Sequence, residues 1–297
     1  MFKKKALERD SFHCPQKWYV CKGFVQIPKI GKVRWAKHRN LQGKPKSITI
    51  TQDGDNWYCS VLCEIEIHEK KKEKDNMVGI DVGLKDFAVL SDGEVIKRQR
   101  FTKDNEKRLS KEQRRLSRKE KGSQNKTKQR RIVQKVHKKI RNSRKDFLHK
   151  TTHDMITKYD GFCLEDLNVK GMMKNHKLAK SIGDVSWSEF MRQLGYKSLW
   201  NFKHFIQISR WFPSTKTCSS CGEKQSMELK DRIYECELCG FVMNRDLNAA
   251  LNILKEGLNT LGHRGINACG DDKVHDFSPK NQVVVDEART KNIRITV

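Results

Sequence analysis

Two short cysteine motifs, separated by fourteen residues, constrain the fold of this chain more than any other feature. Thiolates are preferred ligands of tetrahedral zinc, and a glycine after each motif can adopt the left-handed backbone that such a turn requires. A redox dithiol is the alternative, but it needs one motif at a helix start rather than a matched pair. We therefore predict one structural zinc ion, with a hairpin around Lys230–Arg232 filling the gap. The motifs are Cys218, Cys221 and Gly222, then Cys236, Cys239 and Gly240.

The apolar patterns predict a small β module followed by an α/β core. Residues 57–67 alternate between apolar and polar side chains and are predicted to form a hairpin with 47–51. After a charged break at 70–76 we expect three strands, at 77–83, at 87–90 and from 95 onward. Two basic helices broken near 122–125, a helix at 147–159 and a strand at 162–165 are expected next. The predicted order then ends with a helix from Trp187, a strand at 205–208, the cysteine motifs and a last helix from Leu247. This is the ribonuclease H-like order, an α/β sheet with mixed strand directions.

The same patterns predict where the parts of the chain begin and end. We expect an inserted four-cysteine zinc ribbon to divide the α/β core into two segments, with the β module preceding them. The predicted boundaries are 1–72 for the β module, 73–215 and 241–262 for the core, 216–240 for the zinc ribbon and 263–297 for a polar tail.

Three acidic residues stand out against these predicted elements. Asp81 lies inside an apolar strand, Glu165 ends another, and Asp246 opens the last helix. Each alone has an ordinary explanation: a turn acid beside a strand end, a salt-bridged strand end, and a helix N-cap. In a ribonuclease H-like sheet, however, the first strand, the fourth strand and the last helix converge. Together the three predict a carboxylate cluster that binds two divalent metal ions, for which Mg²⁺ is suited, and hydrolyses phosphodiesters.

The charge balance points to a polyanionic partner. The chain has 62 Lys and Arg residues against 36 Asp and Glu residues, a formal net charge of +26. Nucleic acid is the candidate that relieves so large an excess. Residues 103–150 hold 20 of the basic residues and 5 of the acidic ones. We interpret this segment as a phosphate-binding surface, with a solvated helical face as the alternative. Its candidate contacts are Arg114, Arg115, Arg130 and Arg131.

The sequence lacks membrane signals. No apolar run approaches the ~18 residues that span a bilayer, and the Met1–Lys5 start lacks the apolar core of a signal peptide. The six cysteines outside the paired motifs are scattered, which suits a reducing compartment rather than a disulfide framework. We expect a soluble, cytoplasmic protein with no membrane partner.

Five segments of the chain resemble the TnpB (OrfB) family of insertion-sequence proteins, which are called transposases and are related to type V CRISPR effectors. The resemblance runs over roughly residues 10–260, and its motifs are specific. The segments are GIDVGLKDFA at Gly79–Ala88, LEDLNVK at Leu164–Lys170, NHKLAKSI at Asn175–Ile182, FPSTKTCSSCG at Phe212–Gly222 and NRDLNAA at Asn244–Ala250.

The resemblance implies a RuvC-like DNA endonuclease guided by an RNA from the transposon end. By position it assigns Asp81, Glu165 and Asp246 as catalytic acids and the four cysteines of the paired motifs as zinc ligands. Arg245 and Asn248 belong to the last motif and are expected to support the site. Lys174, Lys177 and Lys180, with His176 and Ser181, lie in a motif loop and are candidate nucleic-acid contacts, with a solvated loop as the alternative.

The chain differs from the family pattern at its N-terminus. Family members carry a further strand and a helical recognition bundle before the segment that corresponds to Pro15–Trp18. If Met1 is the true start, we expect part of the guide- and target-binding lobe to be absent and the β module to have an exposed edge. A non-cleaving nucleic-acid-binding remnant is the alternative function. A strand-transfer transposase is disfavoured, because such enzymes order their acids as Asp, Asp, Glu and this chain has Asp, Glu, Asp.

Overall fold

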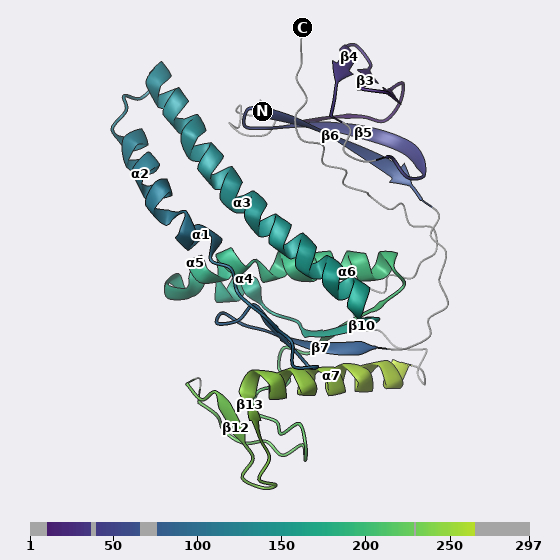
Figure 1. Cartoon of the computed structure of the whole chain (residues 1–297), viewed down its shortest axis with the longest axis vertical. Coiled ribbons are helices and arrows are strands. Elements are labelled where there is room, and N and C mark those ends of the chain that lie inside the picture. Colours follow the sequence, from purple (N-terminus) through teal and green to yellow (C-terminus); the bar gives the residue numbers. More distant parts are fainter. Residues whose placement is uncertain (1–10, 37–39, 66–75, 229, 265–297) are drawn as a thin grey trace, which may run out of the picture. The chain divides into compact units, whose positions relative to one another are not determined.

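The computed structural model describes residues 11–36, 40–65, 76–228 and 230–264 (Figure 1). The chain divides into two compact units. Among the described residues, the first unit comprises 11–65 with 112–135, and the second comprises 76–111 with 136–264. Most of the predicted charged break and nearly all of the predicted polar tail lie outside the described residues.

The first unit contains two small antiparallel sheets. The predicted hairpin is confirmed. Its second strand was predicted to reach residue 67 and, in the described part of the chain, ends at Glu64. Alternating side chains, among them Ile48, Ile50 and Val61, are buried in the core of this unit. The second sheet was not predicted, because its strands have only three or four residues and show little alternation. The strands are β1 Ser11–Cys14, β5 Lys44–Asp53 and β6 Asn56–Glu64 in one sheet, and β2 Tyr19–Cys21, β3 Phe24–Ile27 and β4 Gly31–Arg34 in the other.

The second unit is built on a five-stranded sheet whose order is β11-β10-β7-β8-β9. All five strands were predicted. The strands β7, β10 and β11 are mutually parallel, and β8 and β9 continue the sheet as an antiparallel meander. Their bounds are Met77–Val82 for β7, Ala88–Leu90 for β8, Val95–Ile96 for β9, Gly161–Glu165 for β10 and His204–Ile208 for β11.

The helices and the strands of the ribbon confirm the main sequence predictions and correct three of them. The predicted helix at 147–159 is not separate: it is the end of α3, because no Gly or Pro interrupts that stretch. The motif segment 174–181 is not a loop but largely α5, which the side chain of Asn175 caps. The paired strands of the ribbon flank the second cysteine motif rather than Lys230–Arg232. The bounds are α1 Phe101–Asp104, α2 Glu106–Ser117, α3 Gln124–Lys158, α4 Val169–Met172, α5 His176–Val185, α6 Trp187–Trp200, α7 Arg245–Arg264, β12 Ile233–Glu235 and β13 Val242–Asn244.

The two faces of the five-stranded sheet are covered by different helices. On one face, Val78 and Phe162 are buried together with residues of α6 and the end of α3. On the other, α7 lies along β7 and β10 (Figure 1). Successive strand residues point to opposite faces. The strand residues next to Val78 and Phe162, Gly79 and Cys163, therefore face α7.

Two glycines permit the close approach of α7 to the sheet. A Cβ atom at Gly79 would lie 2.1 Å from the carbonyl oxygen of Ala250. A Cβ atom at Gly257, on α7, would lie 2.3 Å from the sulfur of Cys163. Any larger side chain at Gly79 would therefore push α7 away from β7, and Asp246 lies in the first turn of that helix.

Replacing Gly79 with alanine is expected to lower the free energy of unfolding by about 1–3 kcal/mol, because the new methyl group meets backbone that cannot move aside. Gly195→Ala in α6 is the matched control. Its Cβ would make ordinary contacts of 3.6 Å or more with Phe205, and alanine in a helix is favoured by about 1 kcal/mol. Denaturant unfolding checks both variants. Equal stability of the two variants would contradict the close-approach argument.

No helix in the described part of the chain is both long enough and apolar enough to cross a membrane.

Candidate active site and metal centre

The structure brings Asp81, Glu165 and Asp246 to one face of the sheet in the second unit. Asp81 lies two residues after Gly79 on β7, and Glu165 lies two residues after Cys163 on β10, so both acids share the face that α7 covers. The two strands are parallel, and their last paired positions, Ile80 and Leu164, immediately precede the acids. Asp246, in the first turn of α7, completes the group.

The charges of the three acids influence one another. Desolvation by the surrounding protein, together with the negative charges of Glu165 and Asp246, raises the pKa of Asp81 to about 8, while the charge of Arg245 opposes this rise. Desolvation also raises the pKa of Glu165 against a hydrogen bond from Ser214. All three acids are only partly buried. Partly open carboxylates that repel one another form a hard-oxygen donor set, which fits divalent cations such as Mg²⁺.

The raised pKa of Asp81 predicts how the stability of the metal-free protein depends on pH. Its usual value is 3.8, so the folded protein holds this proton more tightly than the unfolded chain does. The resulting stabilisation is fully present below about pH 4 and is lost as the pH rises through about 8. We expect the free energy of unfolding to fall less steeply over this range in Asp81→Asn than in the wild type. Denaturant unfolding with chelated Mg²⁺ checks this, and parallel curves would contradict it.

Asp246 is not the N-cap of α7. The side chain of Asn244 takes that role, because its Oδ1 accepts hydrogen bonds from the backbone N–H groups of Asp246 (3.0 Å) and Leu247 (3.2 Å). The carboxylate of Asp246 instead faces the guanidinium of Arg245, with Nη2 3.2 Å from Oδ1. The backbone of Arg245 also bonds Arg232 of the cysteine ribbon. The capping explanation for Asp246 is therefore excluded.

A hydrogen-bond network joins the acids to the first cysteine motif. The hydroxyl of Ser214 donates to Oε1 of Glu165, and the carbonyl oxygen of Ser214 accepts from Asn252 at 2.8 Å. Asn248 donates to the carbonyl oxygen of Thr217 at 2.8 Å and accepts from the backbone of Ser219 at 2.9 Å. Ser214, Asn248 and Asn252 are all buried. The segment 214–219 thus links Glu165, the helix that carries Asp246, and Cys218.

Sequence reasoning missed two members of this network, Ser214 and Asn252. Asn252 carried a signal that could have been used, because it lies one helical turn after Asn248 on the apolar face of the last helix. A buried amide on that face needs a polar partner. Ser214 carried no such signal, since its role depends on a carboxylate 49 positions earlier in the chain.

Removing the hydroxyl of Ser214 is expected to weaken the binding of Mg²⁺ to the acids about tenfold, because Glu165 would lose the bond that orients it. Ser214→Ala tests this and Ser214→Thr, which keeps a hydroxyl, is the matched control. The readout is the dissociation constant of Mg²⁺, measured by calorimetric titration. If Ser214→Ala and Ser214→Thr were equally impaired, the hydroxyl would not be the group that matters.

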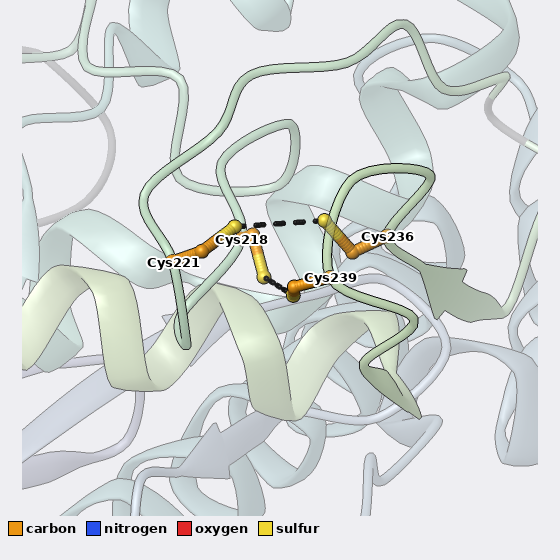
Figure 2. A group of neighbouring side chains, drawn as sticks. All are labelled: Cys218, Cys221, Cys236 and Cys239. Carbon is orange, nitrogen blue, oxygen red and sulfur yellow. Dashed lines mark hydrogen bonds between the residues drawn. The ribbon is translucent and has the colours of Figure 1, made fainter.

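The four cysteines form one cluster, drawn in Figure 2. Their sulfur atoms all lie within 4.8 Å of one another. The Sγ atoms of Cys218 and Cys239 are 3.8 Å apart, and those of Cys221 and Cys236 are 3.6 Å apart. A zinc–sulfur bond of about 2.3 Å in a tetrahedron places the sulfurs about 3.8 Å from each other. The arrangement therefore fits a zinc ion bound by four thiolates.

The two cysteine motifs have matching backbone geometry. In each, the glycine donates to the carbonyl oxygen of the first cysteine at 2.9 Å. Gly222 and Gly240 have φ angles of 83° and 69°, the left-handed conformation predicted for them. Around the second motif, the backbone N–H group of Cys239, and after it that of Leu238, lower the pKa of Cys236 against the desolvation that raises it. Such donors favour the thiolate form, which is the form that binds metal.

The predicted nucleic-acid contacts fall into two groups that belong to different units. Arg114, Arg115, Arg130 and Arg131 are exposed on α2 and α3 in the first unit, where Arg131 lies 3.7 Å from Asp55. Lys174, Lys177 and Lys180 are exposed and belong to the second unit, which also contains the three acids. Lys180 pairs with Glu106. His176 and Lys177 form the first turn of α5.

Two family models match the chain. One is described as "Probable transposase" and covers residues 60–176. The other is described as "Cas12f1-like, TNB domain" and covers residues 187–253. The first match contains two of the acids, Asp81 and Glu165. The second contains Asp246 and all four cysteines.

Named relatives are similar over most of the chain. A protein of Escherichia coli (strain K12) named "Putative RNA-guided DNA endonuclease InsQ" is 33% identical over 91% of this chain and 70% of its own length. A protein of Streptomyces pristinaespiralis named "Putative RNA-guided DNA endonuclease" is 39% identical over 80% of this chain. "TnpB-like protein L79" of Acanthamoeba polyphaga mimivirus is 29% identical over 72% of this chain. The chain spans 58% of the Streptomyces protein and 44% of the viral one.

A solved structure shares the fold. It is described as the cryo-EM structure of a Cas12f1–sgRNA–target DNA complex, and its protein superimposes with a TM-score of 0.52 at 19% sequence identity. The match covers 70% of this chain and 45% of that protein. This likeness concerns the arrangement of the helices and strands.

Proposed function

The chain belongs to the TnpB (OrfB) family of insertion-sequence proteins, and on that premise we propose that it is a metal-dependent DNA endonuclease guided by an RNA from the transposon end. The observation that carries the proposal is the convergence of Asp81, Glu165 and Asp246 on one face of the sheet, each partly open to solvent. Metal-dependent phosphodiester hydrolysis uses a group of hard oxygen ligands and needs no nucleophilic side chain.

The order of the sheet supports a ribonuclease H-like core. Three parallel strands carry two of the acids, an antiparallel pair extends the sheet, and the last helix brings the third acid to the same face. Along the chain, the strands and the main helices of this unit follow the order that the sequence predicts for such a core. The likeness to the Cas12f1 protein supports the same assignment at the level of the fold.

The three carboxylates would hold two Mg²⁺ ions. When bound, Mg²⁺ supplies Lewis acidity toward a phosphodiester and toward water. The residues of the chain supply position and charge. Ser214 orients the carboxylate of Glu165, and Arg245 balances the negative charge beside Asp246. The four cysteines would hold one structural zinc ion, and Asn248 ties the first motif to α7.

The basic surfaces would bind the guide RNA and the target DNA. The exposed arginines of α2 and α3 and the exposed lysines of residues 174–180 are proposed to contact phosphates, which suits a protein that recognises a heteroduplex through its backbone while base pairing selects the target. Because phosphate contacts release counterions, binding by these surfaces should weaken steeply as salt rises.

The test is cleavage of a guide-matched plasmid in Mg²⁺ by the chain co-expressed with transposon-end RNA. Cutting that requires both the RNA and Mg²⁺, and that ceases with a mismatched plasmid, supports the proposal. RNA or DNA binding without any cutting would overturn the nuclease assignment and leave a nucleic-acid-binding protein.

A further inference from the structure

The side chain of Trp211 is the most exposed large hydrophobic side chain in the described part of the chain, with 86% of its surface open to solvent. Tryptophan is more often buried, because its ring removes a large apolar area from water when it packs. A ring held in water next to a functional site is therefore a candidate contact for a ligand.

Trp211 is bracketed by two residues that contact the acid region. Arg210, before it, pairs with Asp166, the residue next to Glu165. Ser214, after it, donates its hydroxyl hydrogen to Glu165 itself. The strand that leads into this segment ends at Ile208, which is paired in register with Glu165. The indole thus lies in a short loop that begins and ends at the candidate active site.

The loop 209–214 has a defined conformation that presents the indole outward. Within it, the backbone N–H of Phe212 donates to the carbonyl oxygen of Ser209 at 3.1 Å. The backbone N–H of Ser214 donates to the carbonyl oxygen of Phe212 at 2.9 Å. The side chain of Ser209 accepts from the backbone of Trp211 at 3.3 Å. Phe212 packs against the buried cluster that includes Ile206 and Ile253. Phe212 therefore packs against α7, whereas the residue before it, Trp211, is exposed to solvent.

We propose that Trp211 is a stacking platform for an unpaired nucleobase of the DNA strand whose backbone lies at the acid cluster. The inference rests on the proposed function and extends it to a specific substrate contact. The face of an indole ring stacks on any base, whatever the sequence. Such stacking contributes to affinity, so removing the ring weakens binding clearly. A base inside a duplex has both faces covered, so the platform selects single-stranded DNA.

The chemistry beside Trp211 favours a nucleic acid over a protein partner. The exposed neighbours Ser209, Arg210 and Lys216 are polar or basic, which suits a phosphate backbone and does not make the continuous apolar patch of a protein interface. Spacing along the chain also fits: the ring is three residues from a side chain that bonds Glu165.

The experiment measures stacking directly and does not depend on cleavage. The full chain in the Asp81→Asn background is mixed, in Mg²⁺, with single-stranded DNA oligonucleotides that carry 2-aminopurine at successive positions. The fluorescence of 2-aminopurine is quenched where the base stacks on an aromatic ring. We expect strong quenching at one position, lost in Trp211→Ala together with about tenfold weaker binding, and largely retained in Trp211→Phe.

Ile233→Ala is the matched control, because it removes another exposed apolar side chain, 64% open to solvent, from β12. Since Trp211 is exposed, its removal should leave the unfolding midpoint unchanged, which circular dichroism verifies. Quenching and affinity that are the same in Trp211→Ala as in the parent would overturn the proposal, as would an equal loss in Ile233→Ala.

The outcome is separable from that of the proposed function. Trp211-dependent quenching in a chain that never cuts DNA would support the stacking site and overturn the nuclease assignment. Guided cutting by the chain, with quenching that ignores Trp211, would support the nuclease assignment and overturn the stacking site.

Discussion

Asp81→Asn is expected to slow guided DNA cleavage by roughly a thousandfold while nucleic-acid binding stays intact. The charges of both Glu165 and Asp246 act on the carboxylate of Asp81, so the group that would hold the metal ions would lose one of its three charged ligands. Metal-ion stabilisation of a transition state is worth several kcal/mol, and each ~1.4 kcal/mol is about tenfold in rate. The amide keeps the size of the side chain, so the fold should persist.

The measurement is a single-turnover cleavage rate at saturating Mg²⁺, with binding to the same RNA and DNA recorded in parallel. Asp104→Asn is the matched control, because it makes the same chemical change at an exposed position on α1. Cleavage by Asp81→Asn at the wild-type rate would show that Asp81 is not a catalytic acid. An equal loss in Asp104→Asn would show that the overall charge is responsible.

Cys236→Ser is expected to abolish both stoichiometric zinc binding and cleavage. A structural zinc site bound by four thiolates contributes folding free energy directly, and in small zinc peptides it amounts to ~10–16 kcal/mol at neutral pH. Without the metal, the segment around Cys218 would lose its anchor. Asn248 would then lose its partners Thr217 and Ser219, and Ser214 would no longer hold Glu165. The defect should therefore reach the acids although no acid is changed.

Zinc content per chain and single-turnover cleavage are measured on the same preparations. Cys21→Ser is the matched control, since Cys21 is a free cysteine in β2 of the first unit. We expect one zinc ion per chain in the control and in the wild type. A Cys236→Ser protein that has lost zinc but cleaves at the wild-type rate would show that the ribbon and the acids act independently.

The elements of the α/β unit were predictable because their signals are local. The buried strands β7 and β10 are short continuous apolar runs, and α7 shows apolar residues at helical spacing. Errors arose where local signals are weak. No breaker separates the two predicted parts of α3, and α5 is short and begins in a polar segment whose cap, Asn175, resembles a loop residue.

The sequence by itself determined which residues carry the chemistry: the two cysteine motifs with their left-handed glycines, three acids in three separate predicted elements, and a large excess of positive charge. These depend on residue type and on short spacing along the chain. Only the tertiary structure decided which face the acids share, since the register of β7 with β10 places Asp81 and Glu165 directly after paired residues of neighbouring strands. It also decided that Asn244, and not Asp246, caps α7. The bonds of Ser214 and Asn248, and the exposure of Trp211, likewise join residues distant in sequence, and such contacts exist only once packing has brought the elements together.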